Sequence, residues 1–142
     1  MTSAQSRNST RLARRTAPAL PEEVLRDRLT AEVVDSALAV RSALGPFYDV
    51  TVYRNALVVE LRRRAVRCQK NVALSVAFRG EVVGSYMADV LVDDALLVKV
   101  MAQGHLDVRF KDHVLQGLGA AGVRLGLLFD FGGSELTFCR IL

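Results

Sequence analysis

The sequence has few cysteines and no long uninterrupted apolar segment. Cys68 and Cys139 are too few and too far apart for a disulfide framework or a zinc knuckle, so each is expected to be a small buried hydrophobe. No stretch approaches the roughly 18 consecutive apolar residues that a membrane span needs. We therefore expect no membrane span, and a reducing compartment, with the cytoplasm as the expected location.

Several residue patterns that are typical of metal, catalytic or phosphate-binding sites are also missing. His105 and His113 are eight residues apart with no cysteine between them, which gives zinc ligation no support. No serine or cysteine has a neighbouring histidine at a spacing that suggests a nucleophile. The glycines between residues 80 and 126 form no phosphate-binding string and are expected in turns or at close packing contacts.

Acidic residues are missing from residues 1–20, which hold four arginines, and the whole chain carries 19 basic and 15 acidic residues. The remainder therefore carries 15 of each sign and is neutral. A domain that binds nucleic acid through its phosphates concentrates positive charge on itself, so this balance does not favour a nucleic-acid partner. Neutrality also removes repulsion between copies, which leaves self-association open.

The composition divides the chain into two parts. Residues 1–20 are rich in Ser, Thr, Arg and Ala and lack periodicity, which predicts a disordered basic N-terminal arm. An organellar transit peptide and a weak anchor for an anionic partner are the alternatives for this arm. Since 51% of all residues are apolar, residues 21–142 are expected to form a single domain with its own core.

Hydrophobic periodicity predicts two helices followed by a sheet. Apolar residues recur at three- and four-residue steps from Leu29 to Leu44, which predicts a helix capped by Thr30. A second helix is expected over residues 49–65, with Asp49 as its N-cap. The other elements are predicted as strands at 72–78, 82–92 and 96–101, a helix at 107–121, and strands at 123–129 and 135–141.

This order of elements predicts an α/β fold, with helices sandwiching a mixed sheet of about five strands. Turns are expected at Arg79-Gly80-Glu81 and Asp93-Asp94, and residues 135–141 are expected at the sheet edge. Gly117 and Gly119 are each expected to weaken the 107–121 helix by roughly 1 kcal/mol relative to alanine.

Several short strings occur in an order and spacing that match a known family. They are Ala43-Leu44-Gly45-Pro46, Val52-Tyr53, Ala56-Leu57, Gly84-Ser85-Tyr86, Ala88-Asp89, Ala121-Gly122-Val123, Gly126-Leu127-Leu128 and Phe131-Gly132. With the order of elements, they resemble the GxxExxY family, a compact branch of the PD-(D/E)XK nuclease-like superfamily, over about residues 29–142. The resemblance implies a three-layer, restriction-endonuclease-like core (helix-helix-three strands-helix-two strands). It also implies a magnesium-type ion at mid-sheet, held by an acid from the helical pair, a strand aspartate, and an acid that precedes a lysine by two residues.

Carried over to this sequence, the resemblance keeps one metal ligand, Asp89, at the position of the strand aspartate, and it keeps the motif tyrosine as Tyr53. The other polar positions are replaced, the motif glutamate by Val50, the second strand acid by Lys99, the lysine by Met101 and a helix glutamine by His113. The resemblance therefore implies a degenerate site.

A single carboxylate does not hold Mg²⁺ firmly, because the ion gives up its water reluctantly. An ammonium about 4 Å from the ion adds about 4 kcal/mol of repulsion per unit-charge pair at an effective dielectric near 20. We therefore hypothesise that Lys99 takes the place of the ion and pairs with Asp89. The alternative is that Lys99 extends to the rim while Asp89 meets water or backbone amides.

A rearranged site with Mg²⁺ at Asp89 is not favoured. Asp49 is one residue from the lost glutamate position, which on a helix rotates it by about 100°. The other nearby acids have simpler expected roles, Asp93 and Asp94 in a turn, Asp107 as a helix cap and Asp112 on a solvated face.

The second helix has more apolar surface than one packed face requires, beyond the stripe of Val50, Tyr53, Leu57 and Leu61. The candidate interface consists of this extra surface and the basic end of the helix, namely Val52, Ala56, Val58, Val59, Arg62 and Arg63. The apolar part is either buried within the domain or a protein–protein surface. The basic part either complements the helix dipole or contacts an acidic patch of a neighbouring subunit or a nucleic-acid backbone.

These observations favour a catalytically inactive nuclease-fold protein without a cofactor. It is expected to act as a binding or self-assembling module, as a homo-oligomer. The alternative is a divalent-metal-dependent DNA or RNA nuclease, or a nucleic-acid binder, with a rearranged site.

Overall fold

The computed structural model describes residues 22–107 and 109–142, so the predicted arm of residues 1–20 lies outside the described residues. The elements are α1 (Glu22–Leu44), α2 (Val50–Arg63), β1 (Cys68–Phe78), β2 (Glu81–Val92), β3 (Leu96–Met101), α3 (Arg109–Ala121), β4 (Leu125–Asp130) and β5 (Thr137–Ile141). Their order is the predicted one, and the predicted α/β class is confirmed. No helix in the described part of the chain is long and apolar enough to cross a membrane.

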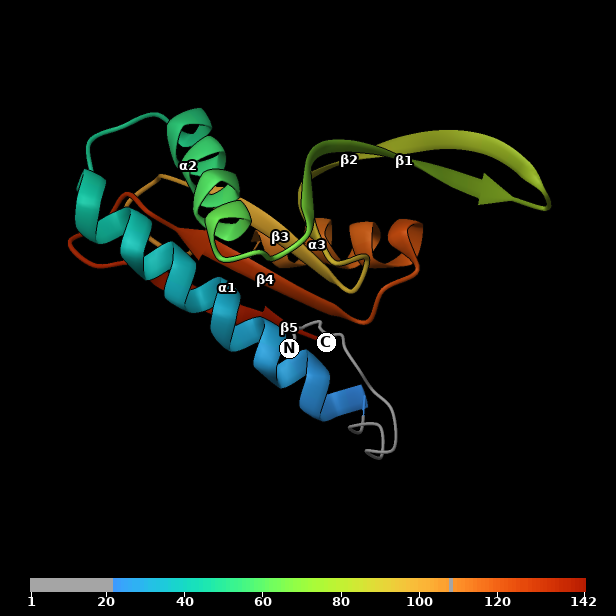
Figure 1. The fold of residues 1–142 in the computed structure, drawn as a ribbon. Helices are drawn as coiled ribbons and strands as arrows, with labels where there is room; N and C mark the ends of the chain where they lie inside the picture. Colours follow the sequence, from blue (N-terminus) through green and yellow to red (C-terminus); the bar gives the residue numbers. More distant parts are fainter. Residues whose placement is uncertain (1–21, 108) are drawn as a thin grey trace, which may run out of the picture.

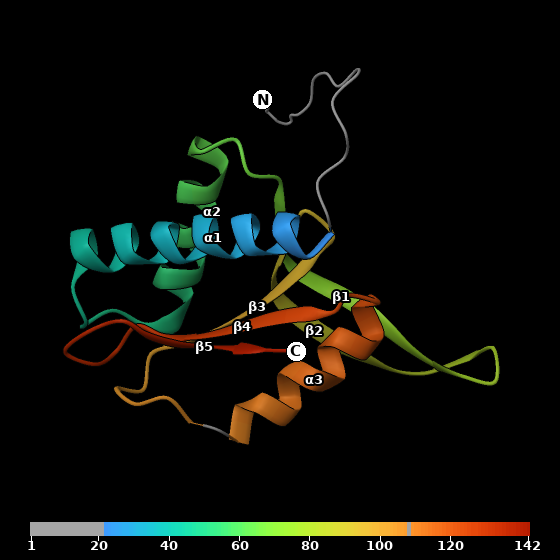
Figure 2. The same cartoon turned by 90° about the horizontal axis from the view of Figure 1, so that it is seen from below.

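The sheet is the middle of three layers, with α1 and α2 on one face and α3 on the other (Figure 2). The strand order is β1-β2-β3-β4-β5. Neighbouring strands are antiparallel except β3 and β4, which are parallel because α3 connects them. The sheet is therefore mixed and five-stranded as predicted, with β5 at one edge and β1 at the other.

Each face of the sheet has its own apolar core. The core beneath α1 and α2 contains Tyr53, Leu57 and Leu61, which are fully buried against the sheet. The core beneath α3 contains Val114 and Leu118 of that helix. The two cores hold both helical layers on the sheet, because burial of apolar surface is the main stabilising term in folding.

Close packing of α3 on the sheet depends on Gly117. A Cβ atom at this position would lie 2.5 Å from the Cδ2 atom of Leu97 and 2.5 Å from the ring of Tyr86. A Cβ atom at Gly119 would meet nothing within 4 Å. Gly117 is thus a packing residue, whereas Gly119 lies on the open side of the helix.

The predicted cap of the first helix was wrong. The helix α1 begins at Glu22, and Thr30 lies inside it, where its hydroxyl donates a hydrogen bond of 2.8 Å to the carbonyl of Arg26. The first turns were missed because charged side chains, among them the exposed Asp27 and Arg28, interrupt the apolar periodicity. The cap of α2 is as predicted, since the Asp49 side chain accepts a hydrogen bond from the Thr51 N–H.

The strands β1 and β2 form a long hairpin whose outer half projects from the body of the molecule (Figure 1). Arg79 and Gly80 form its turn with φ angles of 51° and 80°, because a two-residue turn that matches the strand twist needs positive φ at both positions. The strand β1 begins at Cys68, earlier than predicted, because the polar residues 69–71 obscure its pattern.

Candidate functional site

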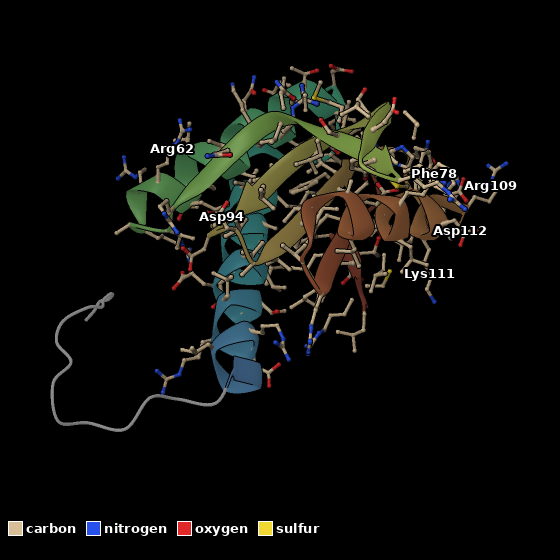
Figure 3. All side chains as sticks on the ribbon, turned by 90° about the vertical axis from the view of Figure 1, so that its right-hand side faces the viewer. Arg62, Phe78, Asp94, Arg109, Lys111 and Asp112 are labelled. Atoms are coloured by element: carbon tan, nitrogen blue, oxygen red, sulfur yellow. The ribbon has the colours of Figure 1, made fainter. Side chains whose placement is uncertain are left out.

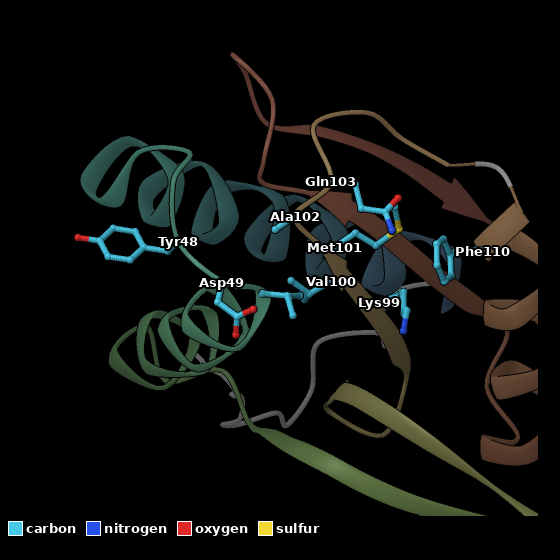
Figure 4. Close-up of a pocket in the computed structure, with 9 residues that line it drawn as sticks. Tyr48, Asp49, Lys99, Val100, Met101, Ala102, Gln103 and Phe110 are labelled. Carbon is cyan, nitrogen blue, oxygen red and sulfur yellow. The ribbon is translucent and has the colours of Figure 1, made fainter.

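The strands β2 and β3 separate at the middle of the sheet, and a cleft lies beside this point. Their backbone pairing ends at Val90 and Val98. One residue further, the Oδ2 atom of Asp89 accepts a hydrogen bond of 2.9 Å from the Val100 N–H, so the side chain continues the pairing. The cleft has a volume of about 290 Å³ and is lined by the start of α2, the end of β3 and Phe110 of α3 (Figure 4).

Two cations flank the Asp89 carboxylate, which is only 13% exposed. The Nζ atom of Lys99 lies 3.7 Å from Oδ2, and the Nη1 atom of Arg54 lies 3.9 Å from Oδ1. The ion pair between Asp89 and Lys99 that the sequence suggested is present, together with the backbone amide contact of the alternative interpretation. Both carboxylate oxygens therefore already have positively polarised partners.

Arg54 was missed by the sequence analysis. It lies four residues after Val50, which places it on the same helix face, one turn later. That face is where the family resemblance puts the motif glutamate, so the four-residue spacing was the available signal. Its contact with Asp89 joins α2 to β2 across the separation of the strands.

Tyr53 anchors the start of α2 and does not project into the cleft. Its ring stacks on Phe131, with 4.8 Å between the ring centroids, and is fully buried. Its hydroxyl donates to the carbonyl of Gly45 and accepts a hydrogen bond of 3.2 Å from the Tyr48 N–H. Tyr53 thus holds the loop that leads into α2 against the core.

Apolar side chains occupy two positions where the resemblance implies charged ones. Val50 lines the cleft and packs against the core beneath α1 and α2. Met101 also lines the cleft, and its side chain is buried in the core beneath α3. Neither can bind a hard cation, because such ions take oxygen ligands.

His113 lies on α3 close to the ion pair. Its ring centroid is 4.8 Å from that of Tyr86, and its Nδ1 atom is buried with no hydrogen-bond partner in the described part of the chain. Burial lowers the pKa of His113, and the nearby charge of Lys99 lowers it further. Burial also raises the pKa of Tyr86 to about 12. His113 is therefore favoured in its neutral form beside a cation.

Asp49 lines the cleft, contrary to the expectation that it would be rotated away. It precedes the helix, with φ −67° and ψ 154°, so the rotation between successive helical residues does not apply to it. Its carboxylate accepts the Thr51 N–H at 3.3 Å. Asp49 is thus a cap residue at the cleft entrance.

The other acids have structural partners or face solvent. Asp93 and Asp94 form the expected turn, and Asp93 pairs with Arg67 at 2.8 Å. Asp107 accepts a hydrogen bond from the Arg109 N–H at the start of α3, and the Arg109 guanidinium holds the pKa of Asp107 at about 2. Asp112 is exposed in the first turn of α3.

The donor set at the centre of the sheet does not fit a magnesium-type ion. No group of three or more acidic, histidine or cysteine side chains in residues 22–107 and 109–142 is placed to hold a metal. A divalent ion at Asp89 would displace the Val100 amide and lie beside two cations, Lys99 and Arg54. Mg²⁺ binds through free carboxylate oxygens, and here both oxygens of the one carboxylate are already engaged, so these residues disfavour the ion.

A family model described as the PD-(D/E)XK nuclease superfamily matches residues 27–141. The chain belongs to this superfamily. No curated protein and no solved structure showed significant similarity to it. The α/β arrangement of this superfamily member is that of a restriction-endonuclease-like core, as predicted.

The candidate interface on α2 of this nuclease-superfamily chain is only partly exposed. Val59 is 58% exposed and Val52 is 37% exposed. Ala56 is partly buried and packs against the core, and Val58 is 2% exposed within it. The assignment of Val58 to an interaction surface was therefore wrong, because the sheet and α1 together bury a wider face of α2 than one stripe.

The basic end of α2 finds acidic partners within the same chain. Arg64 lies 2.7 Å from Glu60 and 2.8 Å from Glu32 of α1. Arg62 and Arg63 are exposed in the last turn of the helix, where positive charge complements the helix dipole. Arg62, at the exposed end of α2, lies far from Phe78 of the hairpin (Figure 3). The end of α2 and the hairpin are therefore separate surfaces.

Proposed function

We propose that this protein is a catalytically inactive nuclease-fold protein of the GxxExxY type, which acts as a binding or self-assembling module. One observation carries the proposal. The Asp89 carboxylate contacts the Lys99 ammonium, the Arg54 guanidinium and the Val100 amide at the same time. Lys99 stands where the family pattern has the second strand acid, and Arg54 and the Val100 amide occupy further contacts of the Asp89 carboxylate.

Electrostatics support this proposal. A divalent ion about 4 Å from each of two cations is repelled by about 4 kcal/mol per unit-charge pair at an effective dielectric near 20. The attraction of Asp89 alone does not offset two such neighbours, Lys99 and Arg54. Val50 and Met101 add no oxygen ligand at the cleft.

Exposed apolar side chains support a role in association. Val59 on α2 and Phe78, Val82 and Val83 on the hairpin are all more than half exposed. Such side chains on the surface of a neutral domain favour contact with another protein surface. We expect a second copy of the chain to supply it.

Thermal unfolding with and without millimolar Mn²⁺ tests the metal-free site. The wild-type melting temperature should not change with Mn²⁺. In the double variant Arg54→Ala/Lys99→Glu, both cations are gone and a second carboxylate stands beside Asp89, so Mn²⁺ should raise the melting temperature. The matched control, Arg54→Ala/Lys99→Gln, should not respond because it lacks the second carboxylate.

The nuclease alternative makes the opposite prediction. If Mn²⁺ stabilises the wild-type protein, or if the wild type cleaves DNA or RNA with Mn²⁺ and Asp89→Asn abolishes this cleavage, the inactive-site proposal is wrong. A nuclease with a rearranged site would then replace it.

A further inference from the structure

The outer half of β1 is an unprotected sheet edge. No strand within residues 22–107 and 109–142 pairs with the free side of β1. Residues 72–78 contain no charge and no proline, which are the usual means of preventing edge-to-edge pairing. The other edge, β5, is shorter and carries Arg140, which pairs with Asp27 of α1 at 3.2 Å.

The side chains of β1 alternate regularly along this segment. The register shift of the hairpin lies between Val76 and Ala77, and the additional residue belongs to β2, so β1 stays regular over residues 72–78, beyond the positive φ of Asn71 (53°). Successive strand residues point to opposite faces. One face therefore carries the larger apolar side chains Val72, Leu74, Val76 and Phe78, and the other carries Ala73, Ser75 and Ala77.

We propose that two copies of this chain pair through their β1 edges, antiparallel, about a two-fold axis at Ser75. This register places Ser75 opposite Ser75 and Val76 opposite the partner's Leu74. The complete set of further pairs is Val72 with the partner's Phe78 and Ala73 with the partner's Ala77. Large apolar side chains then adjoin large ones on one face, small ones adjoin small ones on the other, and one sheet runs through both copies.

The side-chain pattern of the segment favours a second copy as the partner. The paired segment, residues 72–78, is uncharged, ends before the turn residue Arg79, and is separated from Lys70 by Asn71, whose φ of 53° interrupts the extended backbone. No like charges face each other, which would otherwise destabilise the pairing. The segment is thus self-complementary, as an interface about a two-fold axis requires.

This inference rests on the self-association part of the proposed function and is independent of the metal site. It assigns the contact to the hairpin and not to the exposed part of α2. The two surfaces lie far apart on the molecule, as Arg62 and Phe78 show in Figure 3, so separate variants can test them.

Sedimentation velocity of the full chain is the first test. The wild type should sediment as a dimer at micromolar concentration, and Val76→Lys should weaken dimerisation at least tenfold because it places a charge in the pairing edge. Val76 is 40% exposed, so the change leaves both cores intact. The matched control Val59→Lys, a similar change on α2, should leave the dimer unchanged.

Cysteine cross-linking tests the register. On a Cys139→Ser background, Ser75→Cys should form an intermolecular disulfide on mild oxidation, because directly opposite residues have Cα atoms about 4.5–5.5 Å apart. Ala73→Cys alone should not cross-link, since the two copies of residue 73 would be about 13 Å apart along the strands. A mixture of Ala73→Cys and Ala77→Cys chains should cross-link.

The outcomes separate this inference from the proposed function. A monomer at all concentrations would overturn both the edge pairing and self-association. A dimer that survives Val76→Lys and dissociates with Val59→Lys would overturn the edge pairing alone and assign the contact to α2. Assemblies that grow without limit as concentration rises would indicate β1-to-β5 pairing and overturn the two-fold arrangement.

Discussion

The Asp89 carboxylate lies 3.7 Å from the Lys99 ammonium, and the two residues occupy the next positions at which β2 and β3 would pair. The backbone ladder does not continue there, and the Asp89 side chain bonds the Val100 N–H instead. The pair therefore joins two strands at the point where they separate. In this position its main effect is on the cohesion of the sheet.

The variant Lys99→Ala should lower the free energy of unfolding by roughly 1–3 kcal/mol, because it leaves the largely buried Asp89 carboxylate with one cation fewer. In a double-mutant cycle, Asp89→Asn should remove most of this effect, with a coupling energy of at least about 0.5 kcal/mol. Urea unfolding measures both quantities. The exposed Lys111 of α3 is the control, since Lys111→Ala should change stability by less than about 0.5 kcal/mol. Equal effects of the two lysine variants would contradict a structural ion pair.

The pKa of His113 should report on the same pair. Burial and the charge of Lys99 lower this pKa, whereas the charge of Asp89 raises it. Lys99→Gln should therefore raise the pKa of His113 and Asp89→Asn should lower it, as measured by NMR titration of the imidazole signals. Identical titration curves in all three proteins would show that His113 does not sense the pair.

The lowered pKa of His113 has a consequence for stability. The folded protein favours the neutral imidazole, while the unfolded chain binds a proton near the ordinary value of 6.5. The stabilising contribution is thus complete above pH 6.5 and is lost as the pH falls towards the lower pKa of the folded state. His113→Gln should flatten this part of the pH–stability curve.

The two glycines of α3 should respond in opposite directions to alanine. Gly117→Ala should destabilise the protein by about 1–3 kcal/mol, because the added methyl group would overlap the ring of Tyr86 and the side chain of Leu97. Gly119→Ala should stabilise it by about 0.5–1 kcal/mol, because its Cβ meets open space and alanine favours the helix. Thermal unfolding of the two variants measures the difference. Two stabilising substitutions would show that α3 lies further from the sheet than described.

Local sequence patterns were sufficient to predict those features of the fold that depend on neighbouring residues. Apolar periodicity and turn residues predicted the order of elements, and Asp49 and the turn at Arg79-Gly80 were found at the expected positions. The prediction was wrong where polar residues continue an element, as at the start of β1. It was also wrong at Val58, which is buried because α2 is packed by both the sheet and α1.

Patterns within short segments were enough to predict the α/β class and the layers of helices on the sheet, because periodicity and turn residues are local properties. The contact of Arg54 and Lys99 with Asp89, and the position of Asp49 at the cleft, come from the packed fold. Those contacts connect α2, β2 and β3, whose residues are far apart in the chain. Their distances depend on how the helices pack on the sheet, and no local pattern encodes that packing.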